Sequence, residues 1–117
     1  MSLIEFKNVR KHNRFKPSED IEIYISVSSS FYKGSRIKAR LKDISETGMG
    51  IFAVNDLDAD ESIMIDMFFG KTRITTSAMS VYSIELDDGF AIGIKLDESA
   101  EPIMEFIKAR GIDLIKV

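Results

Sequence analysis

Ile21-Glu22-Ile23-Tyr24-Ile25-Ser26-Val27 is the stretch of sequence that decides the fold. Its aliphatic residues stand at every second position, which is the period of a β-strand that buries one of its two faces. Residues 35–42 repeat the pattern, because Ile37, Ala39 and Leu41 alternate with basic residues. The two segments therefore predict two half-buried strands.

The chain beyond them predicts four more strands and one helix. The strands are expected at residues 49–54, 63–69, 72–84 and 90–96, with hairpin turns at 70–71 and 87–89. The helix is expected over Ser99–Arg110. Ser99 can accept from the free N–H groups of the first turn, Pro102 is tolerated there, and Gly111 supplies the stop.

Six short antiparallel strands followed by one helix predict the fold class. We expect an all-β domain with one C-terminal helix, built as a small six-stranded antiparallel β-barrel, because closure removes exposed strand edges. The helix is expected either to plug one open end of the barrel or to cover the run from Ile63 to Phe69, which is apolar on both faces. The expected division is a basic arm at residues 1–16 and the barrel with its helix at 17–117.

Composition limits the chemistry. A chain of 117 residues has room for one hydrophobic core. It has no cysteine and a single histidine, His12, which argues against disulfides, thiolate sites, zinc centres and histidine-based catalytic triads. No nucleophile–base pair is visible, so we do not expect an enzyme. No apolar run approaches the roughly 20 residues of a membrane span, and no signal peptide opens the chain, so a cytoplasmic location is expected.

An alternating acidic segment resembles the start of a calcium-binding loop. It contains Asp56, Asp58 and Asp60. Such a loop needs glycine at its sixth position and glutamate at its twelfth, where this chain has Glu61 and Met67. We therefore expect no metal site.

Charge is distributed unevenly along the chain. Of 16 basic residues, five fall between residues 7 and 16, a segment without a single acidic residue. All 19 acidic residues lie elsewhere, on what is otherwise an acidic body. Broad coating of a nucleic acid would require a basic face over much of the domain. The distribution fits a small anion that is bound at one place.

Arg10 and Arg14 form an R-x-x-x-R pair within this basic arm. On a helix the two guanidinium groups would repel each other on one face, and Pro17 disfavours helical continuation. A guanidinium can form two parallel hydrogen bonds to a phosphate, which a lysine ammonium cannot. The pair therefore indicates an extended arm that can bind an anion.

A second motif, Asp43-Ile44-Ser45-Glu46-Thr47-Gly48, separates two predicted strands. These residue types are common in turns. They can also bind a ligand, because the Asp43 carboxylate accepts hydrogen bonds, the Ser45 hydroxyl donates or accepts them, and Gly48 lets the backbone come close.

The order and spacing of R-x-x-x-R and D-x-S-x-x-G resemble the signature of PilZ domains, and the resemblance extends over roughly residues 9–110. PilZ domains are six-stranded antiparallel barrels with a terminal helix, which agrees with the fold expected from the alternation alone. They bind the bacterial second messenger cyclic di-GMP. The resemblance implies that Arg10, Arg14, Asp43, Ser45 and Gly48 bind this ligand.

The implied function is a receptor without a cofactor. Its arginines would bind the phosphates or the O6 and N7 atoms of guanine, and Asp43 would accept from the N1 and N2 groups of guanine. A separate downstream protein would receive the signal and control motility, surface polysaccharide or biofilm formation. No DNA or RNA partner and no membrane insertion are expected.

Two alternatives remain open. One is a PilZ-like protein-interaction module that no longer binds the nucleotide, although Arg10, Arg14 and the Asp43 turn are all present. The other is a barrel that binds single-stranded nucleic acid through the basic stripe of Arg36, Lys38, Arg40 and Lys42. That stripe contains none of the aromatic residues on which bases would stack.

Overall fold

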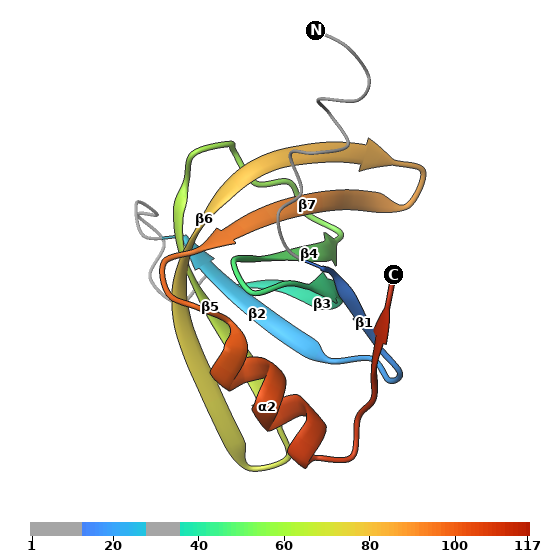
Figure 1. Cartoon of the computed structure of the whole chain (residues 1–117). Coiled ribbons are helices and arrows are strands. Elements are labelled where there is room, and N and C mark those ends of the chain that lie inside the picture. Colours follow the sequence, from blue (N-terminus) through green and yellow to red (C-terminus); the bar gives the residue numbers. More distant parts are fainter. Residues whose placement is uncertain (1–12, 28–35) are drawn as a thin grey trace, which may run out of the picture.

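The computed structural model describes residues 13–27 and 36–117. The strands and the helix in chain order are β1 Phe15–Pro17, β2 Glu22–Val27, β3 Ile37–Ile44, β4 Gly48–Ala53, β5 Ser62–Phe69, β6 Thr72–Leu86, β7 Gly89–Leu96, α2 Glu101–Ala109 and β8 Leu114–Lys116. Figure 1 shows the strands curling around a common interior, with β6 and β7 forming a long curved hairpin and α2 at the other end of the barrel.

Six strands form a closed barrel. Their order is β2-β5-β6-β7-β4-β3, and β3 returns to pair with β2. All of these pairings are antiparallel. The predicted six-stranded antiparallel barrel is confirmed, and the predicted strand bounds agree with the observed ones to within two residues at each end.

The inward residues of the strands make one core. Ile23 and Ile25 of β2 and Ile65 and Met67 of β5 have no exposed surface. On the outer face of β5, Met64 is 38% exposed and Phe68 packs edge-on against Tyr24. The run from Ile63 to Phe69 is therefore covered on its outer side partly by a neighbouring strand. The helix meets β5 at Phe69, whose ring contacts Phe106 of α2.

The helix α2 follows β7 and packs its apolar side against the core. It begins at Glu101, two residues later than expected, because the backbone of Ala100 takes the N-cap position. The Ser99 hydroxyl accepts a hydrogen bond from the Glu101 N–H at 3.2 Å. Ser99 therefore still binds a free N–H group of the first turn, from the position that precedes the N-cap. The apolar side of α2 is buried at Ile103 and Ile107. Gly111 ends the helix at φ +81°, as expected.

Two short strands that the sequence analysis did not predict lie outside the barrel. β1 and β8 pair with each other antiparallel from Phe15–Lys116 to Pro17–Leu114, and Phe15 of β1 also pairs with Ile44 of β3. The expected boundary after residue 16 falls inside β1. This ribbon attaches the segment that follows the basic arm to the end of β3, where the second motif begins.

Candidate ligand-binding face

The turn between β3 and β4 is held by Ser45. The Ser45 N–H donates to the Gly48 carbonyl at 2.8 Å, and the Ser45 hydroxyl accepts from the Gly48 N–H at 3.2 Å. Ser45 is only 3% exposed. Its hydroxyl therefore acts within the turn, and it positions the residues on either side.

Gly48 is required by packing against β7. A Cβ atom at this position would lie 2.5 Å from the backbone oxygen of Ile94, which no side-chain movement can relieve. Gly48 is not among the residues with positive φ. The reason for glycine is therefore the close approach of β4 to β7, and not the left-handed backbone that many glycine turns need.

A β-bulge in β3 turns Asp43 toward the outside of the barrel. Ala39 and Leu41 point inward, so strict alternation would also bury Asp43. The pairing with β4 shifts between Leu41 and Asp43, which makes Lys42 an extra residue on the outer side. As a result Ile44 is fully buried, and Asp43 lies on the outer face beside Lys42.

Arg14 and Asp43 form an ion pair that joins the two motifs. The Arg14 Nη1 donates to Asp43 Oδ1 at 2.5 Å, and the side chains are 22% and 19% exposed. The Val117 N–H donates to the Arg14 carbonyl, so the β1–β8 ribbon holds Arg14 in place. Among the described residues, the buried Nε of Arg14 has no hydrogen-bond partner. Arg10, the other arginine of the pair, lies outside the described residues.

Two glycines lie beside Asp43 on the same outer face. Asp43 pairs with Gly50 of β4, and Gly50 pairs with Gly93 of β7. A Cβ atom on Gly50 would lie 2.7 Å from Asp43 Oδ1, so the carboxylate leans over this glycine. Neither glycine is among the site residues expected from the sequence. Both glycines lie inside strands, and glycine inside a strand indicates that another group approaches the backbone closely. The sequence alone therefore contained a signal for them.

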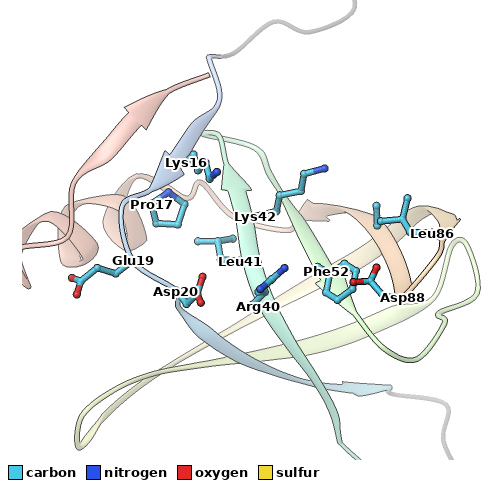
Figure 2. A pocket seen from close by; sticks show the side chains of 11 residues that line it. Lys16, Pro17, Glu19, Asp20, Arg40, Leu41, Lys42, Phe52, Leu86 and Asp88 are labelled. Carbon is cyan, nitrogen blue, oxygen red and sulfur yellow. The ribbon is translucent and has the colours of Figure 1, made fainter.

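A groove adjoins this face. It has a volume of about 480 Å³, within the range of about 300–1,000 Å³ usual for small-molecule pockets. Figure 2 shows Lys42 and Arg40 of β3 beside Phe52 of β4, with Lys16 of β1 and Leu86 of the β6–β7 hairpin at the rim. The Arg40 guanidinium lies 5.0 Å from the centre of the Phe52 ring. Asp43 itself does not line the groove, but Lys42, its neighbour in the chain, does.

The rest of the basic stripe on β3 is paired with acidic side chains. Lys38 Nζ lies 3.0 Å from Glu22, and Arg36 Nη2 lies 3.3 Å from Asp66. The hydrogen bond from Lys38 lowers the pKa of the Glu22 carboxyl, and Glu22 in turn raises the pKa of the Lys38 ammonium. This part of the stripe is a set of cross-strand ion pairs, as in ordinary antiparallel sheets.

The acidic segment before β5 has structural contacts. Asp56 accepts hydrogen bonds from the Leu57 N–H and the Ser83 hydroxyl, and the Asp58 carbonyl accepts from the Ser80 hydroxyl. Within residues 13–27 and 36–117, no group of three or more histidine, cysteine or acidic side chains is arranged to hold a metal ion. In the same part of the chain, no helix is long and apolar enough to cross a membrane.

Comparison with known proteins places these features in a family context. The family model of the PilZ domain matches residues 8–109. Among solved structures, the inhibitor of motility MotI/DgrA of Bacillus subtilis is similar with a TM-score of 0.61 and 13% identity. The match covers 84% of this chain and 47% of MotI/DgrA, so the chain spans about half the length of that protein.

The PilZ domain of YcgR from Escherichia coli, a structure with c-di-GMP, is similar with a TM-score of 0.60 and 16% identity. The match covers 86% of each chain. At such identities, both similarities show the fold alone. A comparison with curated proteins gave no match.

Proposed function

Because this chain belongs to the PilZ domain family, we propose that it is a cytoplasmic receptor for cyclic di-GMP that relays the signal to a separate protein. The observation that carries the proposal is the Arg14–Asp43 ion pair on the outer face of the barrel, beside Gly50. The pair brings together the Arg14 guanidinium, which can bind phosphate or guanine, and the Asp43 carboxylate, which can accept hydrogen bonds from guanine. The YcgR domain of E. coli, which has the same fold, supports the choice of ligand.

Arg14 contributes the guanidinium. Its planar fork matches two phosphate oxygens, or O6 and N7 of guanine. The buried Nε without a partner among the described residues adds a donor that a ligand can satisfy. Arg10 is proposed as the second arginine, on the strength of its place in the R-x-x-x-R pair.

Asp43 contributes the guanine readout. A carboxylate has two oxygens and about four acceptor sites, so the ion pair with Arg14 leaves acceptor capacity for the N1 and N2 groups of guanine. Ser45 and Gly48 serve the site by holding the turn in place. Lys42, next to Asp43 in the chain, adds a positive charge near a dianionic ligand, while the adjoining groove as a whole is lined by three basic and three acidic side chains.

The proposed receptor is not an enzyme, and it needs no metal or cofactor. Its output is a changed surface, because binding at Arg14 would also affect the β1–β8 ribbon that holds this residue. A separate protein would recognise that change. Control of motility is the favoured output, with MotI/DgrA of B. subtilis as the similar protein that suggests it. Polysaccharide and biofilm control are further outputs of the same kind.

Isothermal titration with cyclic di-GMP tests the proposal. The wild-type chain, Arg10→Ala and Arg14→Ala would be compared with Arg73→Ala. The Arg73 side chain is 57% exposed near the start of β6, whereas Leu86, at the other end of this strand, lines the groove. We expect saturable binding by the wild type and by Arg73→Ala, and loss of binding in the other two. A well-folded wild type that gives no binding would instead support an interaction module that no longer binds the nucleotide.

A further inference from the structure

The second half of β6 has an open strand edge. β5 pairs with β6 only as far as Met79, whereas β7 pairs with β6 as far as Leu86. The segment before β5 covers one residue more, because the Ser80 N–H donates to the Glu61 carbonyl and the Ser80 carbonyl accepts from the Asp60 N–H. Within the described part of the chain, β7 is the one strand that pairs with β6 beyond that point. Figure 1 shows β6 as the outer strand of the β6–β7 hairpin.

The backbone groups of this edge point away from β7. Two residues connect β6 to β7, so Leu86 and Gly89 close a β-turn and form a hydrogen-bonded pair. The direction of the hydrogen bonds alternates along an antiparallel strand. The N–H and C=O groups of Ile84 therefore point toward β7, and those of Ser83 and Glu85 point outward. Such an edge is a template for a further strand.

A β-bulge gives the open edge an apolar outer face. The β6–β7 pairing shifts between Ser80 and Tyr82. Ser80 is completely buried, so strict alternation would also bury Tyr82. The bulge instead places Tyr82, Ile84 and Leu86 outside, where they are 48%, 55% and 43% exposed. Open edges with exposed apolar side chains are the ones that pair with another chain.

Residues 82–86 are complementary to a second copy of themselves. When two copies run antiparallel about Ile84, Tyr82 of each copy lies opposite Leu86 of the other, and the two Ile84 side chains lie opposite each other. Ser83 then lies opposite Glu85, so no two like charges are opposed. In this register Ser83 and Glu85 form the hydrogen-bonded pairs, which uses their outward backbone groups. The Ile84 pair is of the other type, in which the side chains come closest.

We propose that this chain forms a symmetric dimer, in which residues 82–86 of β6 from two copies pair antiparallel and join the two barrels into one continuous sheet. This interaction surface goes beyond the receptor function and does not depend on the ligand. Because only residues 82–86 of each copy take part in the pairing, the interface is small, and the dimer should be a weak one that forms at micromolar or higher concentration.

Cysteine cross-linking tests the register, because the chain has no cysteine of its own. Ile84→Cys would place the two thiols opposite each other with Cα atoms about 4.5 Å apart, a separation that a disulfide spans. Leu86→Cys is the control, because its two copies would lie about 14 Å apart along the strands. We expect Ile84→Cys to form a covalent dimer under mild oxidation at least about 10-fold faster than Leu86→Cys. Equal rates would overturn the proposed pairing.

Sedimentation over a range of protein concentrations, without nucleotide, measures the dimer itself. Glu85→Pro removes an outward N–H and leaves the β6–β7 hydrogen bonds in place, whereas Glu85→Ala keeps that N–H. Ile84→Lys places two positive charges opposite each other. We expect Glu85→Pro and Ile84→Lys to weaken the dimer at least about 10-fold and Glu85→Ala to dimerise as the wild type does. Thermal unfolding of each variant would check that it is folded.

Ile115→Lys is a second control, because Ile115 is 58% exposed on β8, the strand at the other open end of the sheet order. It should dimerise as the wild type does. A wild type that stays monomeric at the highest concentration would overturn the proposal. A dimer that Ile115→Lys weakens, and that Ile84→Lys and Glu85→Pro leave intact, would overturn it as well.

Discussion

Arg14 Nη1 lies 2.5 Å from Asp43 Oδ1, although the two residues are 29 positions apart in the chain. The contact depends on two separate features of the fold, which are the β1–β8 ribbon that anchors Arg14 and the bulge that turns Asp43 outward. Each side chain is about four-fifths buried, so the pair is screened less than a surface ion pair.

Arg14→Ala should weaken cyclic di-GMP binding by at least about 1.5–3 kcal/mol, the scale of a hydrogen bond to a charged group. It should also destabilise the fold by about 1–2 kcal/mol, because the partly buried Asp43 loses its partner. Titration calorimetry and chemical denaturation would measure the two effects. Arg14→Lys is a useful companion, since it keeps the charge without the two-pronged geometry and should restore stability more fully than binding. If Arg14→Lys bound cyclic di-GMP as tightly as the wild type does, the proposed two-pronged hydrogen bonding by the Arg14 guanidinium would be wrong.

Asp43→Asn should reduce the preference for guanine over adenine. The amide keeps the size of the side chain but presents one acceptor oxygen where the carboxylate has two, so it matches the N1 and N2 donors less well. The measurement is the ratio of the dissociation constants for cyclic di-GMP and cyclic di-AMP. An unchanged ratio would remove Asp43 from the readout of the base.

Gly48→Ala and Gly50→Ala should separate folding from binding. At Gly48 the new methyl group would meet the Ile94 backbone oxygen, so we expect a loss of about 1–3 kcal/mol of stability. At Gly50 it would meet the Asp43 carboxylate, a side-chain end that can move. We therefore expect a smaller loss of stability but weaker ligand binding in Gly50→Ala. Denaturation curves and titrations of both variants would check the contrast, and a reversed order of stabilities would contradict it.

Ser80→Ala should destabilise the barrel by about 1–3 kcal/mol. Ser80 is completely buried, and its hydroxyl donates to the Asp58 carbonyl and accepts from the Glu61 N–H at 3.1 Å. Removing the hydroxyl takes away both part-buried hydrogen bonds, the one donated to the Asp58 carbonyl and the one accepted from the Glu61 N–H. Ser83→Ala is the control, because its hydrogen bond to Asp56 is exposed and should matter little. A Ser80→Ala variant as stable as Ser83→Ala would show that water replaces the lost hydroxyl.

The Glu22–Lys38 pair should contribute to stability only between two pH limits. The folded pKa of Glu22 is lowered below 4.5, so its contribution is present above that value and is lost as the pH falls through the folded pKa. The folded pKa of Lys38 is raised above 10.5, so its contribution is lost as the pH rises through that raised pKa. The difference in melting temperature between wild type and Lys38→Met, followed from pH 3 to pH 11, should be largest between these limits and small throughout. A difference that grows in acid would contradict the pairing.

Much of the barrel could be predicted from local patterns. The alternation of Ile21, Ile23 and Ile25 predicted which face of β2 is buried, because burial follows the two-residue period of a strand. Gly111 predicted the end of the helix for an equally local reason, the backbone conformation it adopts. The residue types of the two motifs likewise made Arg14 and Asp43 candidates before any contact between them was known.

The sequence by itself therefore determined the fold class, the bounds of the six barrel strands and the candidate residues at the level of single segments. The tertiary structure decided the geometry of the candidate face. The β3–β4 pairing shifts between Leu41 and Asp43, and the β6–β7 pairing shifts between Ser80 and Tyr82. These bulges depend on the hydrogen-bond register between strands, and only that register turns Asp43 and Tyr82 outward. The alignment of Gly50 with Gly93, and the pairing of the three-residue strands β1 and β8, likewise join residues that are distant in the chain. A local pattern describes which face a residue prefers, but it does not specify which residue lies opposite.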